Sequence, residues 1–207
     1  MTRLLLATRN PGKVREILQL FEEGGLRGVV VETLADHPGI GEIEETGKTF
    51  EENARVKATV AAQRSGCWAL GEDSGIELEA LGGAPGVRSA RYAGEPADDA
   101  ANNAKLLREL ADTADRRARY ACVAMLSSPQ GEIVARAGGS CEGVIGREAR
   151  GEGGFGYDPY FVPQGESRTM AQLSPDEKGA ISHRGQALRA LLPALRAHLE
   201  APIGPKS

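Results

Sequence analysis

Cysteine is scarce in this chain. Its three cysteines are Cys67, Cys122 and Cys141, and no two of them form a Cys-x-x-Cys pair. An odd number of widely spaced cysteines is typical neither of a disulfide framework nor of a thiolate metal site. We therefore predict that all three are buried and act as small hydrophobic side chains.

Long apolar runs and a basic excess are missing as well. No stretch approaches the roughly 18 apolar residues of a membrane-spanning helix, and residues 4–7 indicate a strand rather than a signal peptide. The net charge is −4 at pH 7, whereas a protein that wraps duplex nucleic acid usually needs a basic face. We expect a cytoplasmic protein with neither a membrane nor a nucleic-acid partner.

Aromatic residues make up only 4% of the chain, yet four of its eight Phe and Tyr residues fall within residues 155–161. That concentration marks the segment as a candidate site. The charged fraction of 26% and the apolar fraction of 41% are those of an ordinary globular protein. For 207 residues we predict one domain that spans residues 1–207.

The first part of the chain alternates strand-like and helix-like segments. Residues 3–7 predict a strand, and residues 29–31 predict a second one. Between them, a turn at residues 10–12 leads into an amphipathic helix. We expect the buried face of this helix to carry Val14, Ile17, Leu18 and Phe21.

The next part repeats this alternation. Thr49 and Glu52 predict a capping box for a helix that ends at Gly66. Residues 67–70 form a short apolar run, so we expect the acidic pair Glu72-Asp73 to lie at a strand end.

The second half predicts a helix, a hairpin and a final helix. Residues 120–126 and 133–137 predict the hairpin, and residues 184–199 predict the final helix. Strands that alternate with helices early and a hairpin late indicate an α/β fold on a mixed sheet. The helix that precedes this hairpin covers residues 97–114, and we predict that its buried face carries Ala101, Ala104, Leu107 and Leu110.

The turn Thr8-Arg9-Asn10-Pro11-Gly12-Lys13 places hydroxyl, amide and ammonium groups between a strand and a helix start. The free N–H groups and the dipole of a helix N-terminus attract anions, so phosphate is the expected ligand. The turn is not a P-loop, because Ala7 and Val14 stand where that motif requires glycine and Ser or Thr. The alternative is a plain helix cap with a solvated Lys13.

Two acidic pairs, Glu44-Glu45 and Glu72-Asp73, indicate a metal site. Carboxylate oxygens suit Mg²⁺, which usually binds one or two carboxylates together with water and substrate phosphates. A spare carboxylate would deprotonate an attacking water. The trio Asp73-Ser74-Gly75 would lie at the carboxyl end of a strand, where α/β sheets bind ligands. For the first pair, a solvated loop is the alternative.

Two late segments indicate a pocket for a base. Glycines flank Phe155 in Gly153–Pro159, so the backbone can approach a flat ligand while the ring stacks on it, and Asp158 adds an acceptor. Lys178 and Ser182-His183-Arg184 gather donors that suit the O6 acceptor of a 6-oxo purine. The alternatives are a tight turn with a buried Phe155 and a histidine that caps a helix or packs in the core.

Together these segments resemble the inosine triphosphate pyrophosphatase family, the XTP/dITP diphosphatases that hydrolyse deaminated purine nucleoside triphosphates. The resemblance runs in order along nearly the whole chain, which is far more specific than any single motif. Seven segments carry it: Ala7–Lys13, Glu45–Ala54, Glu72–Gly75, Leu81–Gly86, Ser89–Tyr92, Gly153–Pro159 and Ile181–Ala187.

The resemblance implies a role for each candidate residue. Asp73 would be the catalytic general base and a Mg²⁺ ligand, and Glu45 would be the second metal carboxylate. One departure from the family pattern is Glu72, where many bacterial members have aspartate. The implied substrate-binding residues are Thr8, Arg9, Asn10, Pro11, Gly12, Lys13, Ser74, Phe155, Gly156, Tyr157, Asp158, Lys178, His183 and Arg184.

The same resemblance implies a Mg²⁺-dependent hydrolase that removes ITP, dITP and XTP from the nucleotide pool. An activated water would attack the α-phosphorus in line, and pyrophosphate would leave. The resemblance further implies a homodimer of two-lobed subunits. Each subunit would have a long mixed β-sheet flanked by helices, with the active cleft between the lobes.

Two alternatives stay open at this point. A pyrophosphatase for modified pyrimidine or methylated nucleotides would share the sheet, the phosphate turn and the acidic metal ligands, although Lys178, His183 and Arg184 speak against it. A nucleotide sensor would bind a triphosphate without turnover, and such a protein would not need both Glu45 and Asp73.

Overall fold

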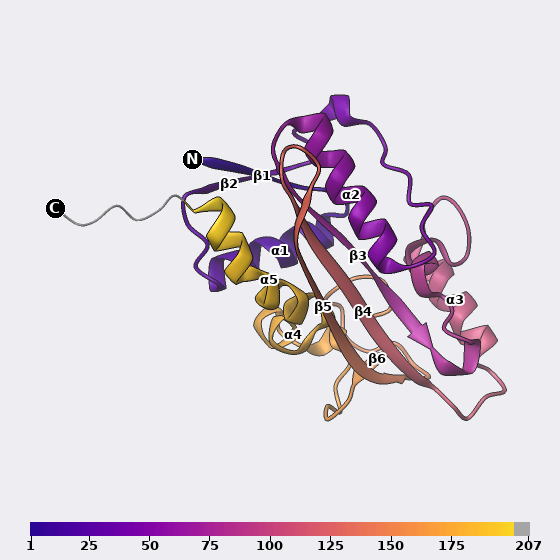
Figure 1. Cartoon of the computed structure of the whole chain (residues 1–207). Helices are drawn as coiled ribbons and strands as arrows, with labels where there is room; N and C mark the ends of the chain where they lie inside the picture. Colours follow the sequence, from indigo (N-terminus) through magenta and orange to yellow (C-terminus); the bar gives the residue numbers. More distant parts are fainter. Residues whose placement is uncertain (201–207) are drawn as a thin grey trace.

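The computed structural model describes residues 1–200, which fold around a six-stranded mixed sheet (Figure 1). The strand order is β2-β1-β3-β4-β5-β6, parallel from β2 to β3 and antiparallel from there on. The predicted α/β fold on a mixed sheet is confirmed. The strands are β1 (Thr2–Leu6), β2 (Val29–Thr33), β3 (Trp68–Leu78), β4 (Arg117–Ser127), β5 (Ile133–Ile145) and β6 (Phe161–Pro163).

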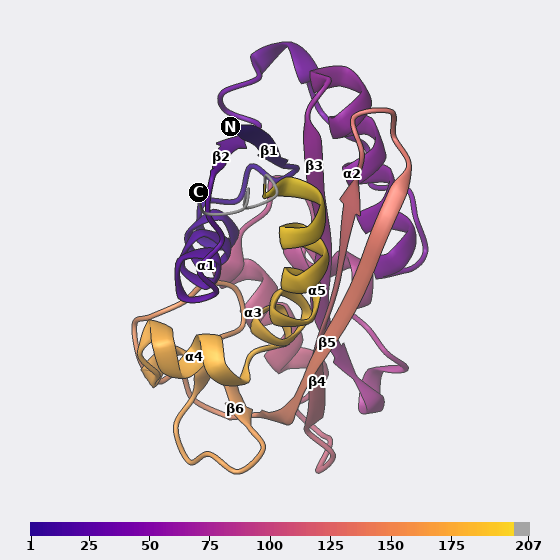
Figure 2. The same ribbon diagram turned by 60° about the vertical axis from the view of Figure 1, so that its left-hand side comes forward.

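Helices cover both faces of this sheet, as the turned view in Figure 2 shows. Helix α2 packs on one face of β3 and β4, and α1 and α5 pack together on the other. The α-helices are α1 (Pro11–Glu23), α2 (Phe50–Ser65), α3 (Asp99–Glu109), α4 (Pro175–Ile181) and α5 (His183–Leu199). The short 3₁₀ helices are η1 (Pro38–Ile40), η2 (Glu79–Leu81), η3 (Gly86–Arg91) and η4 (Met170–Gln172).

The ends of α2 are those that its sequence predicts. The Thr49 side chain accepts a hydrogen bond from the Glu52 N–H, and the Glu52 side chain accepts one in return from the Thr49 N–H, so the capping box is confirmed. The helix ends at Gly66, which adopts a left-handed conformation with φ of 69°. These caps fix where the residues of α2 lie along β3.

The main core lies between the sheet and the pair α1 and α5. All three cysteines are buried and free, as predicted. Among residues 1–200, no helix is both long and apolar enough to cross a membrane. Residues 201–207 lie outside the described part, so the last residues of the predicted domain are not placed.

The predicted apolar faces of two helices were partly wrong. Leu18 is exposed on α1, and Leu20 is buried instead, because the stripe that faces α5 runs through positions 17, 20 and 21. On α3, Ala101 and Ala104 are exposed. The residues buried there are Asn102, Asn103 and Leu106, since the two amides find hydrogen-bond partners inside the fold.

The acidic pair does not lie at a strand end, which corrects the prediction. β3 continues to Leu78, so Glu72 and Asp73 lie in the middle of an 11-residue strand. Pairing with β1, however, stops at Leu70, while pairing with β4 continues along the rest of β3. The pair therefore lies just beyond the carboxyl end of β1.

Candidate active site

A cleft of about 330 Å³ opens beside β3, at the carboxyl end of β1. Because the next residues of β3 have no β1 residues beside them, side chains from both faces of β3 reach this cleft. Pro11 and Gly12 do not line it, although the sequence places them in the site. The other predicted site residues all do: Thr8, Arg9, Asn10, Lys13, Glu45, Asp73, Ser74, Phe155, Gly156, Tyr157, Asp158, Lys178, His183 and Arg184.

Asp73 faces α2, because odd-numbered residues of β3 point to that face. Its Oδ1 accepts a hydrogen bond from Lys57 Nζ at 2.9 Å, and its Oδ2 accepts one from Asn53 Nδ2 at 3.0 Å. The approach of α2 requires Gly71, where an added Cβ would lie 2.3 Å from the Ala54 carbonyl oxygen. The carboxylate is thus oriented by two buried side chains one helical turn apart.

Burial raises the pKa of the Asp73 carboxyl, against the opposing effect of the Lys57 and Lys13 charges. A carboxylate with a raised pKa is a stronger proton acceptor than an ordinary one. Asp73 therefore has the properties of a general base, and its two hydrogen bonds hold it in one orientation.

Glu45 approaches the same lysine from the acidic loop that precedes α2. Its Oε2 lies 3.1 Å from Lys57 Nζ, so the carboxylates of Glu45 and Asp73 converge on one ammonium group. Asp73 is almost fully buried, whereas the Glu45 side chain is 31% exposed. One carboxylate is thus held rigidly, and the other stands at the mouth of the cleft.

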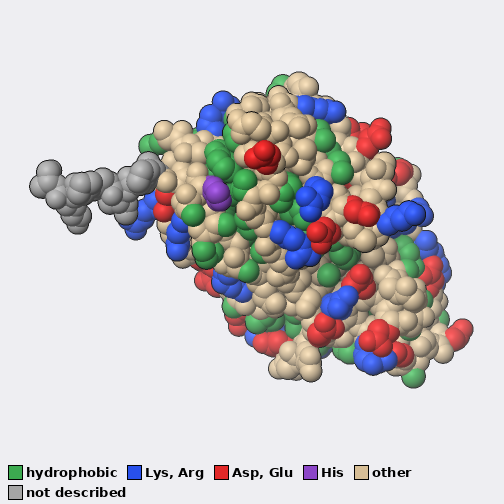
Figure 3. Space-filling view, in the orientation of Figure 1, with side chains coloured by type: hydrophobic (Ala, Val, Ile, Leu, Met, Phe, Trp, Pro, Cys, Tyr) green, Lys and Arg blue, Asp and Glu red, His purple; other side chains and the backbone are tan. Residues whose placement is uncertain are grey.

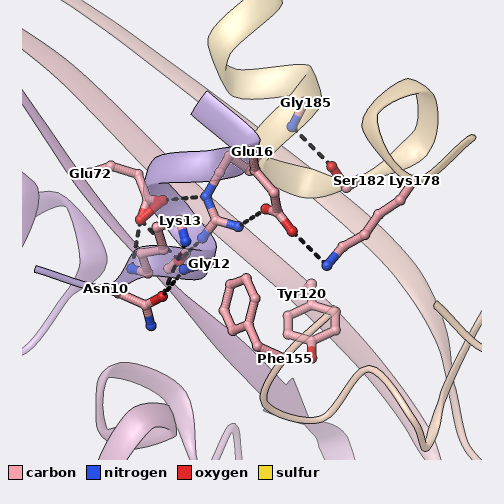
Figure 4. Close-up of polar contacts among 12 residues, drawn as sticks. Asn10, Gly12, Lys13, Glu16, Glu72, Tyr120, Phe155, Lys178, Ser182 and Gly185 are labelled. Atoms are coloured by element: carbon pink, nitrogen blue, oxygen red, sulfur yellow. Dashed lines mark hydrogen bonds and ion pairs between the residues drawn. The ribbon is translucent and has the colours of Figure 1, made fainter. Parts of the chain in front are cut away.

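Glu72 faces the opposite side of β3, toward α1 and α5, and belongs to a different cluster (Figure 4). Lys13 Nζ donates to its Oε1 at 2.7 Å, and Arg184 Nε donates to its Oε2 at 2.7 Å. Burial opposes ionisation, but the charges of Arg184 and Lys13 hold the pKa of Glu72 well below its usual range. Both oxygens of Glu72 are occupied by these internal partners.

The cluster continues through Arg184 to the second part of the cleft. Arg184 also donates to Ser74 Oγ at 2.9 Å and to Glu16 of α1. Glu16 in turn lies 2.6 Å from Lys178 Nζ, and Lys178 donates to Asp158. An unbroken series of ion pairs therefore joins the phosphate turn to the predicted base pocket.

Phe155 lies beside these cations. Its ring centroid is 5.0 Å from Lys178 Nζ and 5.7 Å from the Arg184 guanidinium carbon. The ring lies against α1 at Gly12, where an added Cβ would be 2.6 Å from Phe155 Cδ1. Gly12 thus acts behind the cleft, by leaving room for the ring, rather than as a lining residue.

His183 stacks on Tyr120, with ring centroids 4.6 Å apart and planes 5° apart. Burial and the nearby Arg184 charge hold the pKa of His183 well below its usual range, so the ring is neutral. Its Nδ1 is buried and has no hydrogen-bond partner within residues 1–200. The start of α5 reaches this position because Gly139 leaves room for the His183 carbonyl, which lies 2.2 Å from where a Cβ would be.

In the turn Thr8–Lys13, side chains of the turn itself already accept hydrogen bonds from several of its backbone N–H groups. Asn10 Oδ1 accepts hydrogen bonds from the N–H groups of Gly12 and Lys13, and the Asn10 N–H donates to Thr8 Oγ1. Arg9 donates to the Gly41 carbonyl oxygen. The turn is therefore also the helix cap that the alternative interpretation expected, and its Lys13 is paired rather than solvated.

Sequence reasoning missed several residues that line or support the cleft. Lys57 and Asn53 are the most important, because they hold Asp73. A signal for them existed: two polar residues four apart on an otherwise alanine-rich helix share one face. Also missed were Glu16, Ser89, Arg91, Asp99 and Tyr120.

The donor set fits a hard divalent cation. Within residues 1–200 no group of three or more His, Cys, Asp or Glu side chains forms a closed metal site. Glu45 and Asp73 offer only oxygen donors and converge on a positive charge, the Lys57 ammonium. Two carboxylates suit an ion that keeps waters and takes its remaining ligands from substrate phosphates.

The face of the molecule in Figure 3 carries acidic and basic side chains that are intermixed. No broad basic surface covers the described residues on this face. The concentrated positive charge of the cleft comes instead from Lys13, Lys57, Lys178 and Arg184, each held by internal carboxylates.

The fold and the cleft together define an α/β enzyme in which a buried carboxylate stands beside a cluster of cations at a sheet edge. Comparison with known proteins identifies its family. The Ham1 family matches residues 4–194, and the chain belongs to that family.

Relatives cover nearly the whole chain. A dITP/XTP pyrophosphatase of Mycobacterium tuberculosis H37Rv is 50% identical over 198 residues, 95% of this chain and 96% of its own length. One from Exiguobacterium sibiricum is 51% identical over 199 residues, 95% of this chain and 98% of its own length. The solved HAM1 protein of Coxiella burnetii is 42% identical with a TM-score of 0.85, covering 95% of this chain and 100% of its own.

Proposed function

We propose that this Ham1-family enzyme hydrolyses the deaminated purine nucleoside triphosphates dITP, XTP and ITP to nucleoside monophosphate and pyrophosphate. The similarity to dITP/XTP pyrophosphatases supports the reaction. One observation carries the proposal: a single cleft joins the buried base Asp73 and the cation Lys13 to Phe155 and the basic residues around it. The modified-pyrimidine and sensor alternatives lack that support.

The triphosphate is proposed to lie between the phosphate turn and α2. Lys13 and Lys57 supply positive charge there, and both are held in place by carboxylates, so little reorganisation is needed when negative charge develops on the leaving pyrophosphate. Ser74 Oγ, held by Arg184 and donating to Glu72, is fixed at the same edge. These side chains would therefore keep fixed positions next to the reacting phosphates.

Asp73 is proposed to deprotonate the water that attacks the α-phosphorus. Its raised pKa makes it a good acceptor, and Lys57 and Asn53 leave it one orientation. After the proton moves to Asp73, the bond from the α-phosphorus to the bridging oxygen breaks and pyrophosphate leaves.

Mg²⁺ is the proposed cofactor, with Glu45 and Asp73 as its protein ligands. When bound, it would neutralise charge on the phosphates and favour ionisation of water. Lys57 contacts both carboxylates and would keep them close together with or without the bound metal.

The purine is proposed to stack on Phe155, with its 6-oxo edge toward Lys178 and His183. An ammonium group has three N–H donors, and two of those of Lys178 are directed at Asp158 and Glu16, which leaves one for an O6 acceptor. A 6-amino group at the same place would present a donor to a donor, so adenine nucleotides are disfavoured. Arg184 is more restricted, because it already donates to Glu72, Glu16 and Ser74.

Three further parts belong to the proposal. A homodimer of two-lobed subunits rests on the family resemblance, whereas a cytoplasmic location and a single pyrophosphatase domain over residues 1–207 rest on the composition and length of the chain. Analytical ultracentrifugation at several protein concentrations tests the first of them.

A substrate panel tests the proposal directly. Initial rates with Mg²⁺ are measured for dITP, XTP and ITP, and for dGTP, dATP, dUTP and m⁵UTP, with products separated by ion exchange. We expect the three deaminated purines to be preferred and to yield monophosphate and pyrophosphate in equal amounts. A preference for the pyrimidines, or release of orthophosphate, would overturn the proposal.

A further inference from the structure

Helix α3 binds the loop that carries Phe155 at one glycine. The Gly156 N–H donates to Asp99 Oδ2 at 2.7 Å, and the Gly156 carbonyl oxygen accepts from Asn103 Nδ2 at 2.8 Å. Asp99 and Asn103 are four residues apart, so they lie on one face of the helix. Together these two side chains, the α3 clamp, satisfy both polar backbone groups of Gly156.

The loop needs such an anchor because its own residues do not fix its shape. Phe155 stands between Gly154, with φ of 72°, and Gly156, with φ of 63°. Glycine reaches this left-handed region easily, but it also reaches most other conformations, so two flanking glycines leave the ring direction open. Contacts from outside the loop must therefore set it. Within the loop, Asp158 accepts from the Phe155 N–H at 2.9 Å. From outside it, the Gly153 N–H donates to the Ala171 carbonyl oxygen, and the α3 clamp holds Gly156 directly after the ring.

The α3 clamp is itself well fixed. Asn102 donates to the Ala90 carbonyl oxygen and accepts from the Ala93 N–H, which joins α3 to η3, and Leu106 is fully buried. The N-cap of α3 is Asp98, so Asp99 is not needed to start the helix.

The amide of Asn103 cannot be turned without loss. Its Nδ2 faces two carbonyl oxygens, those of Asp99 and Gly156. This orientation leaves the buried Oδ1 without a partner within residues 1–200. The two carbonyl oxygens thus fix the orientation of the amide, because turning it would place Oδ1 against both of them.

We propose that the α3 clamp is a positioning device for the substrate base: it holds Gly156 so that Phe155 presents its ring to the purine. The inference rests on the proposed function, since it assumes that a base stacks there. Asn103 does not line the cleft and acts through the loop, whereas Asp99 lines it beside Gly156, so agreement between the two variants is what assigns the effect of Asp99 to the loop. Their effect is therefore confined to the part of binding that depends on the base.

The test separates base binding from phosphate binding. For Asp99→Ala and Asn103→Ala, the KM for dITP and the inhibition constant of inorganic tripolyphosphate are measured side by side. We expect each variant to raise the KM about three- to tenfold, as for loss of one hydrogen bond, with kcat unchanged. The inhibition constant of tripolyphosphate, which has no base, should stay the same. The double variant should resemble either single one, because both side chains anchor the same glycine.

Two controls exclude a merely structural effect. Asp98→Ala removes the α3 cap without touching Gly156, so it should lower the thermal midpoint and leave the KM for dITP unchanged. Asp99→Asn keeps an acceptor oxygen for the Gly156 N–H and should restore most of the affinity that Asp99→Ala loses.

Each remaining outcome contradicts a specific claim. An unchanged KM for dITP in the clamp variants, or an equal weakening of tripolyphosphate, would overturn the positioning role. The same is true if Asp98→Ala raises the KM as much as Asp99→Ala does. A wild-type enzyme that does not turn over dITP would instead refute the proposed function, and the positioning role with it.

Discussion

Glu72 and Asp73 are adjacent carboxylates on one strand, yet they belong to two different ionic clusters. Glu72 faces α1 and α5 and is paired with Lys13 and Arg184, while Asp73 faces α2 and contacts Lys57. The pKa of Glu72 is lowered and that of Asp73 is raised. Alternation along a strand is thus enough to give two adjacent carboxylates opposite electrostatic environments, and we propose a structural role for Glu72 and a catalytic one for Asp73.

The opposite pKa directions have opposite consequences for stability. A carboxyl group whose pKa is lowered on folding stabilises the native state when it is ionised, whereas one whose pKa is raised costs stability. The ionised form of Glu72 therefore stabilises the fold, whereas ionisation of Asp73 lowers its stability. The second situation is typical of functional sites.

The largest expected effect is on turnover. Asp73→Asn removes the carboxylate and keeps its size, but the single amide oxygen can accept from Lys57 or from Asn53 and not from both. We expect kcat for dITP to fall about 10²- to 10⁴-fold, with a loss in unfolding free energy of about 1–3 kcal/mol. The loss is limited because burial disfavours the Asp73 charge and Lys57 keeps its contact with Glu45. Steady-state rates and urea unfolding of one preparation measure both. Near-normal turnover would show that Asp73 is not the base.

For Glu72→Gln we expect the main effect on stability instead of turnover. It leaves the buried Arg184 and the half-buried Lys13 without their shared carboxylate, so we expect a loss of about 3–5 kcal/mol in unfolding free energy. Glu77→Gln is the matched control, since Glu77 lies on the same strand in a surface pair with Arg119. A Glu72 variant as stable as this control would remove the contrast between the two carboxylates.

A smaller effect is expected at Glu16, which joins Arg184 to Lys178. Glu16→Gln should lower the unfolding free energy at pH 7 by about 1–3 kcal/mol, while Glu22→Gln on the exposed side of α1 should change it little.

The pH dependence of stability gives a second measure of Glu16. Burial opposes its ionisation, but Arg184 and Lys178 lower its pKa. Its stabilising contribution is therefore fully present above the ordinary carboxyl value of about 4.3 and is lost as pH falls through the lowered value. The Gln variant should show a shallower loss of stability below about pH 4, and an unchanged slope would contradict the assigned pairing.

The smallest effect is expected at the surface pair of Arg119 and Glu77. Arg119→Ala should change the unfolding free energy by about 0.5 kcal/mol or less, because both side chains are partly solvated. A larger change would mean that charge pairs outside the cleft also support the fold strongly, which would blur the comparison between the two carboxylates.

Local signals in the sequence predicted local structure well. The capping box of Thr49 and Glu52 and the stop at Gly66 depend on residues a few positions apart, and the structure has both. The helix after the turn at residues 10–12 is present too, but it begins earlier, at Pro11, because Asn10 caps it. The same holds for the hairpin of β4 and β5. All of the predicted site residues except Pro11 and Gly12 line one cleft.

Partners brought together by tertiary structure could not be predicted in this way. Lys13 and Glu72 are 59 residues apart, and Glu72 and Arg184 are 112 apart, so no spacing rule connects them. The length of β3 was underestimated because Gly71 and Gly75 interrupt its apolar pattern; both are needed for close packing, against α2 and η3 respectively. Asn102 and Asn103 were overlooked because buried amides do not follow hydrophobic periodicity.

Binding of dITP to the Asp73→Asn variant tests the central claim most directly. By isothermal titration calorimetry with Mg²⁺ we expect a Kd within about fivefold of the KM-derived affinity of the wild type, together with the loss of turnover. The reason is that the proposed phosphate and base contacts come from other residues, and Glu45 and the substrate phosphates would still bind the metal. If binding were lost in proportion to turnover, Asp73 would hold the substrate rather than activate water. The assignment of a structural role to Glu72 and of the base to Asp73 would then be wrong.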